Sequence, residues 1–303
     1  MIAMKKPNRR HLKSSALSFA GWVLAASSAL ASQGGELPPV PEPPTFDTAD
    51  PVAYGAQIAS FADRYDQGWF DEISLGRMTL FDGGGDSVER SFTRMVLEDA
   101  ELGDKIIVRF MSPAEIKGVA ALTHEHAGET DDNWLYLPSN KRVRRISGAN
   151  KTASFQGTEF TYEDLSNLEV REYDWRFIDE ATLERDGANV PVLRVEGVPN
   201  YADTGYSRIL VYYNKDNWRR ERMEYFDKSG QHLKTQDLSA WKHLHDRFWR
   251  ADRFVMANHL TGKRTELEQE KVYLNLSLYP SSKDGEPRAN LDDSRFTTQA
   301  LQL

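Results

Sequence analysis

The sequence predicts a mainly β fold of the α+β class: a large curved antiparallel sheet that forms an incomplete β-barrel closed by a few helices. From Trp69 onward, apolar and polar residues alternate with a period of two, and turn residues interrupt the alternation at short intervals. The chain shows no repeated strand–helix alternation, which argues against a doubly wound sheet or a TIM barrel. A dozen long strands in one sheet tend to curl, so helices and an apolar cavity can occupy the concave face.

The first 31 residues are typical of a secretory signal peptide. Five basic residues precede an apolar run from Ala16 to Leu30, and small residues stand before the expected cleavage near Ala31. A retained amphipathic anchor is the alternative. No cysteine follows the run, so we expect a soluble mature chain without an acyl anchor. In a Gram-negative bacterium, its compartment is the periplasm.

The next segment, residues 32–47, contains five prolines and is expected to be a linker in extended conformation. Residues 48–303 show no break in composition, and we expect them to form a single half-barrel domain.

This domain begins with one amphipathic helix. Asp50 is expected to cap the helix, and Pro51 suits its first position. The apolar residues that recur at helical spacing before Gly68 are Ile58, Phe61, Ala62 and Tyr65.

Strands follow in succession. The predicted strands are 72–82, 87–98, 105–111, 119–126, 134–137, 142–146, 170–183, 190–198, 207–214, 219–227, 232–240, 250–259 and 264–278. One short helix is expected to interrupt them at Thr161, with Asp164 at the capping-box position.

Composition excludes several chemistries. The chain has no cysteine, and its formal charge of −8 argues against nucleic acid as a partner. It carries no glycine-rich phosphate loop, no G-x-S-x-G elbow and no H-E-x-x-H helix. His124 and His126 share a strand face but lack a third ligand nearby in sequence, so we interpret them as polar surface residues. We therefore expect no enzyme activity, no catalytic residue, no metal and no cofactor.

The only basic cluster is the run from Lys141 to Arg145. On a strand, Arg142 and Arg144 share one face. They are candidates for contact with an anionic lipid headgroup or with the acidic patch of a partner, and a solvated edge is the alternative.

The aromatic and aliphatic side chains of the central strands are candidates for lining a ligand cavity. Core packing is the alternative for each of them. The candidates are Ile106, Val108, Phe110, Leu122, Trp134 and Tyr136.

Several motifs together resemble one family, the outer membrane lipoprotein-sorting proteins, or LolA-like group. The motifs are RFMSPAEIKG at 109–118, LTHEH at 122–126, DNWLYLP at 132–138, KRVRRI at 141–146 and SFQGTEFTYEDL at 154–165. The resemblance implies an incomplete antiparallel barrel with an apolar cavity for acyl chains. It also implies a link to inner-membrane exporters of the resistance–nodulation–division (RND) superfamily.

Two hypotheses of function follow. The first is a soluble periplasmic carrier or chaperone that binds a lipid or lipoprotein acyl chain and passes it from an exporter to an outer-membrane acceptor. In this hypothesis Phe155, Gly157 and Phe160 belong to a lid loop that opens for cargo. The second is an envelope sensor or accessory subunit that binds a protein partner. A hydrolase would need clustered acids, whereas the adjacent Asp131 and Asp132 diverge on a strand.

Overall fold

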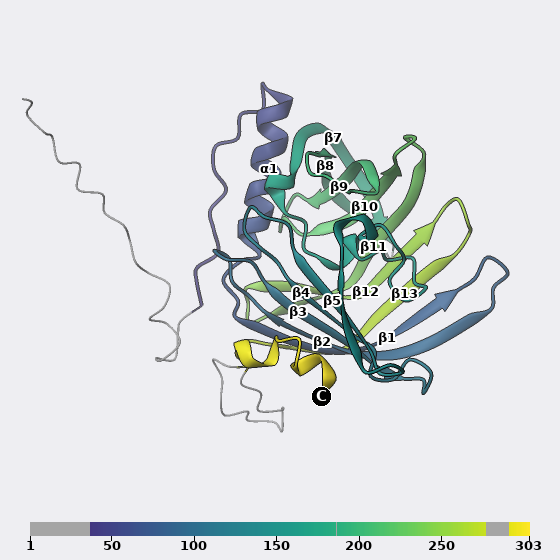
Figure 1. Ribbon diagram of the computed structural model, residues 1–303. Helices are drawn as coiled ribbons and strands as arrows, with labels where there is room; N and C mark the ends of the chain where they lie inside the picture. Colours follow the sequence, from purple (N-terminus) through teal and green to yellow (C-terminus); the bar gives the residue numbers. More distant parts are fainter. Residues whose placement is uncertain (1–36, 186, 277–290) are drawn as a thin grey trace, which may run out of the picture. The chain divides into compact units, whose positions relative to one another are not determined.

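A computed structural model of the chain describes residues 37–185, 187–276 and 291–303 (Figure 1). The predicted signal peptide lies outside the described residues. Among the helices of the described ranges, none is long and apolar enough to cross a membrane.

The predicted first helix is confirmed as α1 (Pro51–Tyr65). The Asp50 side chain accepts a hydrogen bond of 2.9 Å from the backbone N–H of Val52, as an N-cap residue should. The buried face of α1 includes Ile58 and Phe61, and Gly55 lies directly against the backbone at Phe177.

The predicted sheet is confirmed as a single antiparallel sheet of thirteen strands. The strands are β1 (Asp71–Phe81), β2 (Ser87–Leu97), β3 (Lys105–Ser112), β4 (Ala120–His124), β5 (Asp132–Leu137), β6 (Arg142–Ile146), β7 (Tyr173–Arg185), β8 (Ala188–Pro199), β9 (Tyr206–Asn214), β10 (Arg220–Asp227), β11 (His232–Leu244), β12 (Phe248–Asn258) and β13 (Arg264–Leu274). Their order is β6-β5-β4-β3-β2-β1-β13-β12-β11-β10-β9-β8-β7. Within the described part of the chain, β6 and β7 are the two edges and no ladder joins them, so the curved sheet stays open.

Two segments cover the concave face of the sheet. Helix α1 packs mainly on β7, and its apolar face joins the buried side chains of β8–β10. The second segment, residues 147–172, connects β6 to β7, and we call it the strap. Its Phe155 stacks on Phe110 of β3, with ring centroids 5.6 Å apart.

The predicted helix at Thr161 is reduced to a single 3-10 turn, Glu163–Leu165. The expected capping bonds are nevertheless present: the Thr161 N–H donates to Asp164 (2.6 Å), and the Asp164 N–H donates to the Thr161 hydroxyl (3.3 Å). Within the described residues, the concave face of the sheet is therefore covered by one α-helix and an irregular strap, where the sequence predicted a few helices. The other 3-10 turns in the described ranges are Gly148–Asn150 and Val170–Glu172 in the strap and Asp293–Arg295 and Ala300–Gln302 near the C-terminus.

The opposite face of β3–β5 is covered by the C-terminal segment, residues 291–303. Its Leu291, Phe296 and Leu301 are buried against this face. The Arg109 guanidinium donates to the carbonyl oxygens of Ala300 and Leu301 at 2.9 and 3.0 Å, which holds the segment in place.

Part of the predicted linker is also packed. Phe46 lies 5.5 Å from the Trp218 ring and 6.2 Å from the Phe61 ring, and Leu37 packs against a buried cluster. Burial of these two apolar side chains is more favourable than their exposure to water in an extended tether. From residue 37 onward, the linker is therefore not a free tether.

Substituting Gly55→Ala should destabilise the fold. A Cβ atom at Gly55 would lie 2.4 Å from the Phe177 backbone nitrogen, and overpacking of this kind costs about 1–3 kcal/mol, more than the helical gain of about 1 kcal/mol. We expect urea denaturation to show a lower free energy of unfolding. Gly84→Ala is the control, because a Cβ there meets only the Asp82 side chain at 3.4 Å. Equal stability of both variants would contradict the close packing of α1 on β7.

Candidate functional site

A cavity of about 630 Å³ lies between the concave face of the sheet, α1 and the strap. Its size falls within the range of about 300–1,000 Å³ that is typical of sites for small molecules. Every layer of the fold contributes to its wall. Ala59 and Ala62 come from the helix, Phe155 and Phe160 from the strap, and Phe254 from the sheet.

The polarity of the cavity changes along the strands. At one end the lining is apolar and aromatic, and these residues are Met78, Phe92, Tyr206, Met223, Tyr225, Phe254 and Leu267. At the other end it is charged, and these residues are Glu72, Arg94, Glu98, Arg219, Arg220, Arg247 and Arg250. In β1, Glu72 and Met78 are six residues apart, a distance of about 20 Å. The apolar end lies toward the hairpin turns at 82–86, 228–231 and 259–263.

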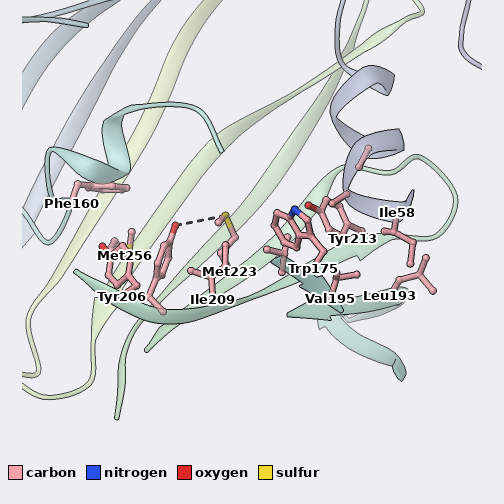
Figure 2. Packing of buried hydrophobic residues seen from close by; sticks show 14 residues of the cluster. Ile58, Phe160, Trp175, Leu193, Val195, Tyr206, Ile209, Tyr213, Met223 and Met256 are labelled. Carbon is pink, nitrogen blue, oxygen red and sulfur yellow. Dashed lines mark hydrogen bonds between the residues drawn. The ribbon is translucent and has the colours of Figure 1, made fainter. Parts of the chain in front are cut away.

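Figure 2 shows the buried cluster along one side of the cavity. Phe160 of the strap lies near Tyr206 and Met256, while Ile58 of α1 lies at the other end of the cluster near Leu193. The strap and α1 thus meet the same continuous apolar surface.

The charged end contains a buried ion-pair network. The Glu72 carboxylate accepts from Arg94 Nη1 and Arg250 Nε, both at 2.8 Å, and Arg250 Nη1 also donates to Asp66 at 2.9 Å. Burial by itself would raise the pKa of Glu72, but the two guanidinium groups outweigh burial and hold this pKa below its usual value. Glu72 is therefore ionised and fully paired.

Three other carboxyl groups near this end lack a cationic partner in hydrogen-bond contact. Burial raises the pKa of Glu98 to about 9, although the Gly68 N–H donates to it. Burial likewise raises the pKa of Glu125 to about 8, and it raises the pKa of Asp104. Asn167 of the strap donates to both Glu125 (3.0 Å) and Asp104 (2.9 Å). Glu98 and Glu125 are therefore protonated at neutral pH, and Asn167 ties the strap to the sheet.

A buried ion pair fixes the strap on the other side of the cavity. Lys234 Nζ of β11 lies 2.5 Å from Asp164 Oδ2, and both side chains are only 2% exposed. The Tyr206 hydroxyl donates to the second Asp164 oxygen at 2.7 Å. Asp164 thus joins the strap to β9 and β11.

The predicted cavity residues divide between the two faces of the sheet. Val108 lines the cavity, and Ile106 and Phe110 belong to the same buried cluster. Leu122, Trp134 and Tyr136 lie on the opposite face, beneath the C-terminal segment. The register explains the division, because Leu122 pairs with Ile107 of β3 rather than with Ile106 or Val108.

The predicted lid residues lie in the strap. Phe155 and Phe160 are buried and line the cavity, whereas Gly157 has a φ of +81° and open space around it. Arg142 and Arg144 are exposed on β6. They lie opposite Leu137 and Leu135, which belong to the concave side, but neither arginine lines the cavity.

The two histidines of the LTHEH motif bind protein groups. His124 Nε2 lies 2.7 Å from the Phe296 carbonyl oxygen, and His126 Nε2 lies 3.2 Å from Asp132. In the described ranges, no three histidine, aspartate or glutamate side chains are grouped closely enough to hold a metal ion.

Sequence reasoning missed the charged end and the β9–β13 wall of the cavity. Glu72 and Arg250 are 178 residues apart, so no local pattern joins them. The available signal was a glutamate within the alternation of β1 at a position where an apolar residue was expected. Such buried charges require partners, which sequence spacing alone does not identify.

A thirteen-stranded open sheet with a cavity on its concave side defines a half-barrel fold. Solved structures of the same architecture exist. The chain is 33% identical to an outer membrane lipoprotein-sorting protein domain from Vibrio parahaemolyticus, with a TM-score of 0.74 over 82% of this chain and 98% of that one. It is 28% identical to a DUF1329 family protein from Desulfovibrio piger, with a TM-score of 0.72 over 83% of this chain and 99% of that one.

A LolA superfamily protein from Nitrosomonas europaea shares the fold, with 18% identity and a TM-score of 0.61 over 81% of this chain and 99% of that one. A family model described as "Uncharacterized protein" matches residues 103–302. No curated protein matches the sequence. The chain belongs to the outer membrane lipoprotein-sorting protein family.

Lys234→Met should loosen the strap. The substitution leaves the Asp164 carboxylate buried without its cation, which costs about 3–5 kcal/mol in the free energy of unfolding. Adding Asp164→Asn should recover most of this loss. Lys215→Met is the control, because its ion pair with Glu180 is exposed and is worth about 0–1 kcal/mol. A loss no larger than that of the control would contradict the anchoring role of Lys234.

Glu125→Gln should change the pH dependence of stability. The folded-state pKa is raised above the unfolded value, so the native protein holds a proton that the unfolded chain releases above about pH 4.5. Wild-type stability therefore falls as pH rises toward about 8, by up to about 1.4 kcal/mol per pH unit for this group. Urea denaturation at pH 5 to 8 should show a shallower fall for the variant. The exposed Glu129→Gln should keep the wild-type slope, and an unchanged slope for Glu125→Gln would refute the assignment.

Proposed function

We propose that this protein is a soluble periplasmic carrier or chaperone that holds the acyl chain of a lipid or lipoprotein in the cavity. The observation that supports the proposal most is the cavity of about 630 Å³, whose apolar end is lined by aromatic and methionine side chains. The similarity to a lipoprotein-sorting domain from Vibrio parahaemolyticus supports the same class of ligand.

The energetics of an acyl chain fit such a cavity. Each methylene that leaves water contributes about 0.8 kcal/mol, so ten methylenes contribute about 8 kcal/mol before the costs of binding. Because the sheet, α1 and the strap already form the cavity, little of this energy is needed to order the protein.

The proposed activity is binding without catalysis. The acidic side chains at the charged end are engaged in ion pairs, as Glu72 and Asp66 are, or in hydrogen bonds to Asn167 and to the backbone. These contacts give the acidic side chains a role in stabilising the fold.

The sequence and the family support a periplasmic location for the proposed carrier. The predicted signal peptide favours export to the periplasm. We propose an RND-superfamily exporter in the inner membrane as the donor and an outer-membrane acceptor as the destination. Arg142 and Arg144, exposed on the concave side of β6, are suited to transient contact with anionic headgroups during transfer.

Native mass spectrometry of residues 32–303, purified from the periplasm without detergent, tests the proposal. We expect one lipid or acyl peptide per chain. Leu267→Trp should lower the occupancy severalfold, because Leu267 lines the cavity opposite Met78 and Phe254 and the larger ring fills the space. Leu210→Trp is the control, since Leu210 is buried in a cluster on the other face of β9.

Urea denaturation of both variants shows whether they remain folded. A wild-type chain that stays free of lipid after incubation with envelope lipids would contradict the carrier function and favour a sensor that binds protein. Equal occupancy in Leu267→Trp and Leu210→Trp would place the ligand outside the cavity.

A further inference from the structure

Three arginines line the charged end of the cavity in addition to Arg94 and Arg250 of the ion-pair network. Arg219, Arg220 and Arg247 line this end together with Trp218, Trp241 and Trp249. They lie in the turns between β9 and β10 and between β11 and β12 and in the strand ends beside these turns, and Arg247 contacts the end of α1.

Arg220 is the least satisfied of these cations. It lies opposite Tyr213, whose side chain belongs to the cluster on the concave side. Arg220 is half-buried, yet its side chain has neither a hydrogen bond nor an ion pair with any side chain or carbonyl in the ranges that the structure describes. Asp63 of α1 interacts electrostatically with Arg220, but the two do not form an ion pair, and the Asp63 side chain accepts from Gln67 at 2.8 Å.

Arg247 is buried without an anion. Its guanidinium donates to the carbonyl oxygens of Tyr65 (2.5 Å) and Gln67 (3.4 Å), at the C-terminus of α1, while its Nε has no partner among the described residues. No described carboxylate lies within 4.0 Å of the Arg247 guanidinium. The neighbouring Asp66 pairs with Arg250 instead. Burial lowers the pKa of Arg247 by more than the nearby Asp66, Tyr65 and Glu98 raise it.

Arg219 is held in a fixed position between two aromatic rings. Its guanidinium carbon lies 4.7 Å from the centroids of both Trp241 and Trp249, and its Nε donates to Glu221 at 2.7 Å. The two Nη groups of this preorganised guanidinium remain able to donate. Trp249, which contacts Arg219, is two residues from Arg247 in the sequence. Arg219 and Arg247 therefore lie near the same end of the cavity.

The acids that face this cluster do not neutralise it. Asp66 and Glu72 are used by Arg250 and Arg94, and Glu221 is used by Arg219. Glu98 accepts from the Gly68 N–H and holds a proton at neutral pH, because burial raises its pKa to about 9. Asp99, Asp104 and Glu125 also line this end. Asp99 accepts from the backbone N–H of Leu102, and Asp104 and Glu125 accept from Asn167. Asp63 accepts from Gln67, and burial raises its pKa.

We propose that Arg220, Arg247 and Arg219 form a subsite for the phosphate of a lipid headgroup, so that the ligand is a phosphate-bearing amphiphile. Guanidinium groups bind phosphate oxygens through charge-assisted hydrogen bonds, which are the strong ones in a partly buried site. The acyl chain then runs along the strands toward Phe254 and Phe160 at the apolar end. This inference rests on the proposed carrier function and specifies the substrate class and its orientation.

Competitive lipid loading tests the subsite. The mature chain is incubated with mixed vesicles containing equal amounts of dioleoylphosphatidylglycerol and dioleoylglycerol, and the bound lipid is identified by native mass spectrometry. We expect phosphatidylglycerol to be preferred about tenfold, as one charge-assisted hydrogen bond provides. Arg220→Gln should reduce the preference to near unity without reducing dioleoylglycerol uptake, and Arg220→Lys should restore part of it. The exposed Arg176→Gln is the control.

Each other outcome has a separate meaning. Equal loading of the two lipids by the wild-type chain, or an unchanged preference in Arg220→Gln, would overturn the phosphate subsite and leave the carrier function intact. No loading of either lipid would contradict the carrier function itself. A further arm adds inorganic phosphate at the concentration of the lipid. Displacement of phosphatidylglycerol would mean that the arginines bind free phosphate, which would overturn the headgroup assignment.

Discussion

The buried ion pair between Lys234 and Asp164 determines whether this sheet encloses a cavity. Without the strap, the concave face of an open thirteen-stranded sheet would be a groove with Phe110 and Tyr206 exposed to water. Lys234 reaches Asp164 across the chain, and Asn167 ties the same strap to the carboxyl groups on the opposite side. These polar anchors are expensive to desolvate, so they hold only while their partners remain in contact. Such anchors suit a cover that must close firmly and also release a ligand.

The cost of burying charge also bears on the difference between the two ends of the cavity. Strand alternation places Glu72 and Met78 on one face of β1, and the neighbouring strands repeat this change from charged to apolar residues. A folded core would normally replace Glu72, Arg94 and Arg250 by apolar side chains, because packed hydrophobic residues are often as stable as buried ion pairs. Retaining charges beside an empty volume makes structural sense if the occupant is itself polar at one end. The cavity therefore matches an amphiphile better than a purely apolar molecule.

Much of the fold could be predicted from the sequence because its signals are local. The alternation in each strand, the turn residues between strands and the Asp50-Pro51 cap specify elements without reference to distant residues. The site could be predicted only in part, because it depends on register and on distant pairings. Leu122 was assigned to the cavity on apolar character alone, and pairing with Ile107 places it on the other face. Glu72 and Arg250 meet only after β1 and β12 have joined the same sheet, and so their pairing could not be inferred from spacing.

In the proposed complex, the cavity holds an amphiphile with its head among the arginines and its tail beneath the strap. Photocrosslinking with a phospholipid that carries a diazirine at the end of one acyl chain, followed by peptide mapping, tests this orientation. We expect labelling of the strap near Phe160 and of β12 near Phe254, with little labelling near Arg220. Labelling concentrated around Arg220, or on the outer face at Leu122 and Tyr136, would contradict it.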